Sequence, residues 1–256
     1  MKRAKLVVAY DGTGFRGFAA NEGVRTVMGV LGEAVATVVR RPVELTGAGR
    51  TDAGVHAWGQ VVSGDLPGGI DLDDLRRRLN KLCAPDIAVR RAEWTDAEFD
   101  ARSSAQWRHY RYEIWNAPEP NPLLARTSWW VARPLAMWAL QAGSDALVGE
   151  HDFSSFCRRP KVDDGFAEPS MTRRVLSTRW SGVSAAGDGP LLRFEIRATA
   201  FCHQMVRSIV GTLVDVGTGK LSPGGVHAIL AARDRAAAGQ VAPPQGLTLW
   251  EVGYRA

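Results

Sequence analysis

The sequence predicts an α+β protein made of two ferredoxin-like, RRM-like halves whose sheets are mainly antiparallel. Three observations support this fold class. The N-terminal part shows the element order β-α-β-β-α-β, which is the split βαβ pattern of ferredoxin-like domains. The rest of the chain repeats that order loosely. The composition, 45% hydrophobic and 23% charged over 256 residues, is that of a globular chain and excludes disordered and fibrous proteins.

Hydrophobic spacing and capping residues predict the elements of the first half. Thr26 can cap a helix in which apolar side chains recur at helical intervals, and Asp71 can cap a second one. The apolar run that ends at Tyr10 predicts a buried strand, followed by a glycine-rich turn. The expected elements are strands at 6–10, 43–46, 59–63 and 87–93, and helices from Thr26 to about Val39 and from Asp71 to Leu82.

The second half shows the same kinds of pattern, with a boundary near residue 101, so the two expected domains are 1–101 and 102–256. The segment from Arg158 to Ser170 is the clearest long loop, because it combines prolines, a glycine and charges. The expected elements are strands at 106–115, 172–180, 191–200 and 249–254, and helices at 135–147, 202–216 and 226–232.

Charge and cysteine content narrow the class of protein further. The net charge is +5, and arginine supplies most of the 32 basic side chains, which suits bidentate recognition of phosphates. Cys83, Cys157 and Cys202 are widely spaced without a CxxC pair, so we expect neither a disulfide framework nor a zinc site. The chain shows no signal-peptide core and no apolar stretch of about 18 residues. We therefore expect no membrane association and a cytoplasmic protein.

Two glycine-rich segments resemble nucleotide-binding motifs only in part. Gly12, Gly14 and Gly17 spell GxGxxG after a strand, but the helical pattern does not begin until Thr26, so a bound phosphate would lack a helix N-terminus. A structural turn is the favoured interpretation, and a dinucleotide-binding oxidoreductase is the less favoured alternative. The segment 217–221 is not a P-loop, because Leu221 stands where a Ser or Thr must bind magnesium.

The segment GAGRTDAGVHA, at 47–57, places Arg50 and Asp52 between small residues. Residues two apart in extended backbone point to the same side, so the guanidinium and the carboxylate can share one pocket mouth. A nearby arginine favours the ionised carboxylate that a nucleophile requires. An Asx-turn with a surface ion pair explains the same residues equally well.

Aromatic and arginine side chains alternate along the strand that follows the boundary. Arg108, Tyr110 and Tyr112 lie on one face of this strand, and His109 and Arg111 lie on the other. Such a pattern suits stacking on unpaired bases beside phosphate contacts, although ordinary strand packing explains the aromatic residues as well.

The helix expected at 202–216 has a polar stripe and one arginine at the edge of its apolar arc. Arg207 lies about 20° from Val214 in helical projection. A partly buried arginine needs a carboxylate partner, for which Asp52 is a candidate, or its head group reaches solvent. The stripe consists of Gln204, Ser208, Thr212 and Asp215.

Together these segments resemble the tRNA pseudouridine synthase A family through nearly the whole chain. The segment at 47–57 is highly specific for the family, and the others are specific in combination. They fall in the family's order: YDGTGFRGF at 10–18, GAGRTDAGVHA at 47–57, ARSSAQWRHYRYEIWN at 101–116, DFSSF at 152–156, FCHQMVRSIVGTLVDVG at 201–217 and GLTL at 246–249.

The resemblance implies isomerisation of uridine to pseudouridine at positions 38, 39 and 40 of the tRNA anticodon stem-loop, without cofactor or metal. It implies that Asp52 is the nucleophile, attacking uracil C6 or ribose C1′, with Arg50, Tyr110 and Arg207 as further catalytic residues and Leu247 in the base pocket. We expect Arg108, Arg111, Arg158 and Arg159 to face phosphates. The family is homodimeric, and its two halves meet at a central RNA-binding cleft. A non-catalytic RNA-binding protein is the main alternative.

The chain departs from the family at two positions expected to contact RNA. Phe18-Ala19-Ala20 stands where Trp-Gln is usual, and His109 stands where an arginine is common. Both differences concern substrate affinity or breadth more than the chemistry.

Overall fold

The computed structural model describes residues 1–159, 169–184 and 190–255. The chain divides into two compact units. Unit 1 consists of Met1–Trp107 together with the residues from Thr248 onward, and unit 2 is Arg108–Leu247. The last strand of the chain therefore belongs to unit 1, although the whole of unit 2 precedes it in the sequence.

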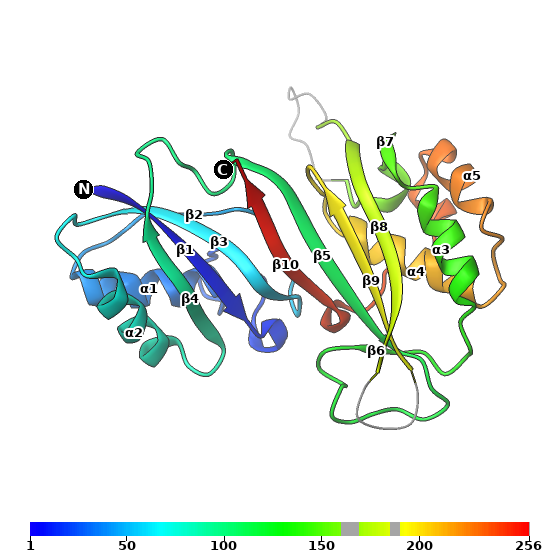
Figure 1. Ribbon diagram of the computed structural model, residues 1–256, viewed down its shortest axis with the longest axis horizontal. Coiled ribbons are helices and arrows are strands. Elements are labelled where there is room, and N and C mark those ends of the chain that lie inside the picture. Colours follow the sequence, from blue (N-terminus) through cyan, green and yellow to red (C-terminus); the bar gives the residue numbers. More distant parts are fainter. Residues whose placement is uncertain (160–168, 185–189, 256) are drawn as a thin grey trace. The chain divides into compact units, whose positions relative to one another are not determined.

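Unit 1 has the ferredoxin-like order that the sequence predicts. Its strands lie in the order β4-β1-β3-β2 with antiparallel pairing, and β10 pairs with β3 in parallel. Helices α1 and α2 pack side by side (Figure 1). The elements are β1 (Lys2–Tyr10), η1 (Gly12–Gly14), α1 (Val27–Val39), β2 (Leu45–Gly47), β3 (His56–Leu66), α2 (Leu72–Cys83), β4 (Ile87–Trp94) and β10 (Leu247–Tyr254).

The two helices of unit 1 begin where the capping signals predict. The Thr26 hydroxyl accepts a hydrogen bond from Gly29 N (3.2 Å), and Asp71 accepts from the backbone N–H groups of Asp73 and Asp74. Each helix buries one apolar face, represented by Leu31 in α1 and Leu79 in α2, against the sheet. Within the described part of unit 1, neither α1 nor α2 covers the opposite face of the sheet.

Apart from the short β6, unit 2 has the order β-α-β-β-β-α-α, so it repeats the order of unit 1 only loosely. Its strands lie in the order β5-β9-β8-β7 with antiparallel pairing, and the short β6 pairs with β5 in parallel. Helix α3 packs against α4 and β8 (Figure 1). The elements are β5 (Ala105–Trp115), β6 (Trp129–Trp130), α3 (Met137–Asp145), β7 (Gly149–Asp152), η2 (Ser154–Phe156), β8 (Thr172–Ser184), β9 (Pro190–Ala198), α4 (Met205–Gly217), α5 (Gly225–Ala232), η3 (Arg235–Ala237) and η4 (Pro244–Gly246).

Helix α4 differs from its prediction in two ways. It begins at Met205 and not at 202. Gln204 adopts a left-handed conformation (φ 62°), which a right-handed helix does not contain. Two of the four residues in its polar stripe, Ser208 and Thr212, are buried, which helical spacing alone does not predict. Thr212 accepts a hydrogen bond from Gly239 N (2.9 Å), so the chain after α5 covers this side of the helix.

The sequence predicts no disulfide framework, and the structure contains a cysteine pair that the sequence does not predict. Cys157 and Cys202 form a disulfide with their Cα atoms 5.8 Å apart, while Cys83 is free and buried. The two cysteines are 45 residues apart, so only the tertiary fold brings them together. Most of the expected long loop, residues 160–168, lies outside the described residues.

Candidate active site

In unit 1, the segment between β2 and β3 that carries Asp52 is fixed to the sheet by its backbone. Ala48 N donates to Val61 O (2.8 Å), and the buried Gln60 donates from Nε2 to Gly49 O (2.8 Å). Within the loop, Val55 N donates to Asp52 O (3.2 Å), which closes a tight turn after the carboxylate. We call residues 47–55 the Asp52 loop.

Tyr10 and Phe18 hold the same loop from its other side. The Tyr10 hydroxyl hydrogen-bonds Thr51 Oγ1 (2.8 Å), and Phe18 N donates to Thr51 O (3.1 Å). Burial raises the pKa of Tyr10 far above its usual value, so the phenol is neutral and remains a hydrogen-bonding group. Gly47 is required here, since a Cβ on it would lie 2.3 Å from the Phe18 ring. Phe18, one of the two departures from the family, therefore packs on the loop.

The glycine-rich turn after β1 is a structural support for the Asp52 loop. A Cβ on Gly12 would lie 2.0 Å from Val55 O, and Gly12 N donates to the buried His56 Nδ1 (3.0 Å). Helix α1 begins only at Val27, so no helix N-terminus follows Gly17. The structural interpretation is confirmed, and the geometry does not fit dinucleotide binding.

Asp52 and Arg50 differ in exposure. Asp52 is half-buried, whereas Arg50 is exposed and makes no hydrogen bond or ion pair within the part of the chain that the structure describes. The alternative of an Arg50–Asp52 surface ion pair is therefore wrong. The Arg50 guanidinium is available to an incoming ligand.

In unit 2, the predicted catalytic residues lie on β5 and α4. Tyr110, on β5, is 8% exposed and packs edge-on against the Phe201 ring, with 5.0 Å between centroids. Arg207, on α4, is half-buried and donates from Nε to Ala242 O (2.7 Å). Arg207 O in turn accepts from Ala242 N (3.0 Å), so the backbone after α5 fixes this side chain at its base.

Leu247 and Tyr112 lie where the chain enters β10. Leu247 is buried. The preceding Gly246 packs on the Tyr112 ring, because a Cβ there would lie 2.5 Å from its Cζ atom. The Tyr112 hydroxyl donates to Pro243 O (2.8 Å), and burial raises the pKa of this phenol despite the opposing charge of Arg207. Tyr112 thus fixes the backbone that leads to Leu247.

The four arginines expected at phosphates have different surroundings. Arg108 donates from Nη1 to Thr199 O (2.9 Å), and Arg111 forms an ion pair with Glu195 (Nε to Oε1, 2.8 Å) on the paired strand β9. Arg158 and Arg159 are both exposed, and Arg158 N donates to His203 O (3.0 Å) next to the Cys157–Cys202 pair. The alternation of Arg111 and Tyr110 on opposite faces of β5 agrees with their cross-strand partners Glu195 and Ile196.

Sequence reasoning missed the residues that position the site. Gln60 is completely buried in β3, and Gly211 lets Gln240 pass along α4, since a Cβ at Gly211 would lie 1.8 Å from Gln240 O. No local pattern identifies either residue, because both roles depend on contacts with distant parts of the chain. Tyr10 could have been identified from the sequence, because it is the first residue of the family's first motif.

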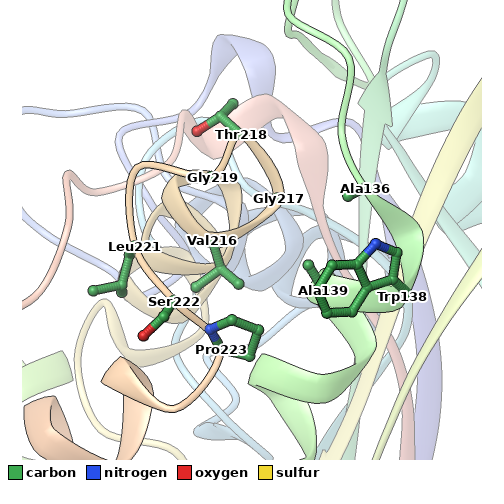
Figure 2. Close-up of a pocket in the computed structure, with 10 residues that line it drawn as sticks. All are labelled: Ala136, Trp138, Ala139, Val216, Gly217, Thr218, Gly219, Leu221, Ser222 and Pro223. Carbon is green, nitrogen blue, oxygen red and sulfur yellow. The ribbon is translucent and has the colours of Figure 1, made fainter.

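A pocket of about 400 Å³ in unit 2 contains none of these residues (Figure 2). It lies where α4 ends, beside Thr218, Gly219 and the exposed Trp138 of α3. The C-terminal end of a helix presents carbonyl groups and a partial negative charge, which disfavour phosphate. The structure therefore agrees that segment 217–221 is not a P-loop.

The described ranges hold no cluster of three or more His, Cys, Asp and Glu side chains that could bind a metal ion. No helix there is long and apolar enough to cross a membrane.

The two ferredoxin-like units and the fixed Asp52 loop define an α+β protein that presents a carboxylate from a rigid turn. Comparisons with known proteins identify the family. The family model for tRNA pseudouridine synthase matches residues 6–102 and 144–255. The chain therefore belongs to the tRNA pseudouridine synthase family, and it is an isomerase that converts uridine to pseudouridine in tRNA.

Several curated relatives, each called tRNA pseudouridine synthase A, match over their length. The protein of Brevibacillus brevis is 42% identical over 255 residues, covering 99% of this chain and 100% of the relative. That of Geobacillus kaustophilus is 40% identical, covering 99% of this chain and 95% of the relative. The protein of Leifsonia xyli is 41% identical, and the match covers 98% of this chain and 91% of the relative.

Proposed function

We propose that this enzyme acts on uridines 38, 39 and 40 of the tRNA anticodon stem-loop, with Asp52 as its nucleophile. The observation that carries the proposal is the immobilised Asp52 loop, in which Gln60 and Tyr10 hold Gly49 and Thr51, the residues that lead into the carboxylate. Positions held this firmly suit covalent catalysis, because the nucleophile must approach one carbon atom along one direction.

The reaction breaks the bond between N1 and C1′ and forms a bond between C5 and C1′, and the C5 hydrogen leaves as a proton. Asp52 assists by adding to C6 of the base or to C1′ of the ribose, and it is released at the end. No atom is gained or lost apart from the exchange of that hydrogen with water, so no cofactor or metal is needed.

Other residues of both units act on the same nucleotide in this proposal. Tyr110 and Leu247 hold the detached base while it rotates, and Arg207 orients the Asp52 carboxylate. Arg50, whose guanidinium is exposed, occupies the space that the flipped nucleotide leaves. Arg108, Arg111, Arg158 and Arg159 contact phosphates, with the exposed Arg158 and Arg159 contributing most.

Release of tritium from tRNA that contains 5-tritiated uridine tests this proposal. Asp52→Asn preserves the shape of the side chain but removes its nucleophilicity, so we expect turnover to vanish while tRNA affinity stays within a few fold. Asp65→Asn is the matched control, because Asp65 is an exposed aspartate of the same unit that pairs with Arg3. Activity of Asp52→Asn above one per cent of wild type contradicts the assignment. Binding of tRNA by the wild type without tritium release favours a non-catalytic RNA-binding protein.

Two further parts of the proposal concern assembly and location. We propose a homodimer in the cytoplasm, in which two chains of charge +5 double the positive surface that faces the RNA. Light scattering after gel filtration checks the assembly, with an expected mass of twice 27.8 kDa. A mass of 27.8 kDa at micromolar concentration contradicts it.

A further inference from the structure

The helix-free face of the unit 1 sheet is covered differently at its two ends. Side chains alternate along β1, so Leu6 and Val8 face the helices, and Lys5 faces the other way. The Lys5 ammonium lies over the rings of Phe99 (5.6 Å) and Tyr254 (5.2 Å), which cover one end of this face. The other end carries Trp58, whose indole is 44% exposed.

Trp58 is part of a three-layer stack. Its ring lies against that of Trp250 from β10, with 5.9 Å between centroids and 21° between planes. On its other side the Arg90 guanidinium lies 3.8 Å from the ring centroid. Arg90 Nη1 also donates to Trp58 O (3.0 Å), so the guanidinium is held flat over the indole.

A β-bulge brings Arg90 and its neighbour to this face. Val7 pairs with Arg91 but Val8 pairs with Val89, so Arg90 is an extra residue in β4. Val89 is buried on the helix side, and Arg90 therefore points to the opposite face. Arg91 lies on that same face, because it pairs with Val7.

Arg90 crosses β1 to reach Trp58 on β3, since β1 lies between β4 and β3 (Figure 1). Between them lie the paired residues Ala9 and Ala88. Because alanine side chains are single methyl groups, they leave room for the long Arg90 side chain. A bulge, two small residues and two indoles thus combine to hold one guanidinium flat on the surface.

The charges on this face are not balanced. Its carboxylates are paired with other cations, Glu93 with Lys5 (2.8 Å) and Asp65 with Arg3 (2.9 Å). Within the described ranges, neither Arg90 nor Arg91 has a carboxylate partner. The result is a positive surface around a flat, exposed guanidinium.

We propose that Trp58, Arg90 and Arg91, here called the Trp58 platform, bind the RNA substrate outside the catalytic loop. An unpaired base stacks on the outer face of the Arg90 guanidinium, which Trp58 holds in plane, and Arg91 contacts an adjacent phosphate. The proposal rests on the proposed function in that the RNA is the tRNA substrate. Trp58 acts as a positioning residue for Arg90.

The test measures tRNA binding and steady-state tritium release for a set of platform variants. We expect Arg90→Ala and Trp58→Ala each to weaken binding and raise KM about five- to tenfold, the loss of one base stack, with kcat unchanged at saturating tRNA. Arg90→Lys keeps the charge but not the plane, so it should bind almost as weakly as Arg90→Ala. Trp58→Phe restores a flat ring under Arg90 and should bind within about twofold of wild type.

Matched controls come from other surfaces. Arg76→Ala changes an exposed arginine on α2, and Trp138→Ala changes an exposed tryptophan of unit 2, so neither should alter KM. The platform is refuted if Arg90→Lys binds like wild type, or if Trp58→Ala binds no more weakly than Trp138→Ala. A changed oligomeric state in Trp58→Ala with unchanged affinity also overturns it in favour of a protein interface. Binding of tRNA by the wild type without tritium release contradicts only the proposed function. The Trp58 platform is tested by tRNA affinity, which does not depend on turnover.

Discussion

At the scale of single residues, the hydroxyl of Tyr10 is the smallest group whose removal should separate positioning from stability. Tyr10→Phe deletes the hydrogen bond to Thr51 beside Asp52, and Tyr254→Phe deletes a hydrogen bond of the same length (2.8 Å) to Ala101 O in the same unit. Each variant should lose about 1 kcal/mol of stability. Only Tyr10→Phe should lower kcat, because only this hydroxyl supports the Asp52 loop. Urea unfolding and tritium release measure the two effects, and equal kcat values would contradict the positioning role.

His109 should make stability depend on pH. Burial lowers its pKa to about 4, and this effect outweighs the attraction of Glu195, 3.3 Å from Nε2. The unfolded histidine has a pKa of about 6.5, so the unfolded state binds the extra proton between these values. The stability that neutral His109 contributes is therefore complete above pH 6.5 and is lost as the pH falls towards 4.

The measurement is urea unfolding of wild type and His109→Gln from pH 7 to pH 4. Wild type should lose on the order of 2–3 kcal/mol more than the variant over this range. His227→Gln, at an exposed histidine of α5, should follow wild type at every pH. Parallel curves for wild type and His109→Gln would show that folding does not lower the pKa of His109.

Residue-scale prediction from the sequence succeeded where the partner was near in the chain. The alternation along β5 assigned Arg111 and Tyr110 to opposite faces, as the structure has them. The Arg111–Glu195 ion pair spans 84 residues, and the Cys157–Cys202 pair spans 45. Nothing local in the sequence identifies such partners, because the strands and loops that bring them together are set by the whole sheet.

At the scale of elements, Gly211 determines whether the segment around Ala242 can lie on α4. A Cβ at this position would meet a backbone oxygen that cannot move alone, so Gly211→Ala should lower stability by about 1–3 kcal/mol. It should also lower turnover, because displacement of Ala242 O releases the Nε of Arg207.

Gly32→Ala is the matched control for that change. Gly32 is also a helix glycine, but its Cβ would meet nothing within 4 Å. Alanine is the better helix former, so this variant should gain up to about 1 kcal/mol and keep full activity. Melting temperatures and tritium release together test the pair. Normal turnover in Gly211→Ala would show that Ala242 does not help to hold Arg207.

Elements with clear caps and long apolar patterns were predicted well. Helices α1 and α2 begin next to Thr26 and Asp71, as their capping side chains indicate. The two-residue β6 and the four-residue β7 were missed, because segments this short show no periodicity. Helical spacing indicates the polar stripe of α4 but not that the segment around Gly239 buries Thr212 and donates a hydrogen bond to it.

At the scale of the whole molecule, the excess of positive charge should make tRNA binding depend strongly on salt. Arg158→Ala should reduce the slope of log affinity against log salt by roughly 0.7–0.9, and Arg159→Ala should reduce it less, because Arg159 already interacts with the Asp152 carboxylate. Arg111→Ala should reduce it less, because Glu195 already neutralises part of that charge. Arg76→Ala, on α2, should leave the slope unchanged. Filter binding between 50 and 200 mM salt, roughly the range over which such losses are large, measures the slopes. A flat salt response would contradict phosphate contacts altogether.

The composition of unit 1 has a consequence for how the protein is made. Its strand β10 pairs with β3 and contributes Leu249, which is fully buried, and the Tyr254 hydroxyl that binds Ala101 O. A ribosome makes the Asp52 loop early, yet it must translate all of unit 2 before β10 emerges. At about 5–20 residues per second, this takes on the order of ten seconds or more. Throughout that interval the nascent unit 1 lacks the partner of β3 at His56 and Ala57, and an unpaired strand end is the kind of surface that aggregates and that chaperones bind.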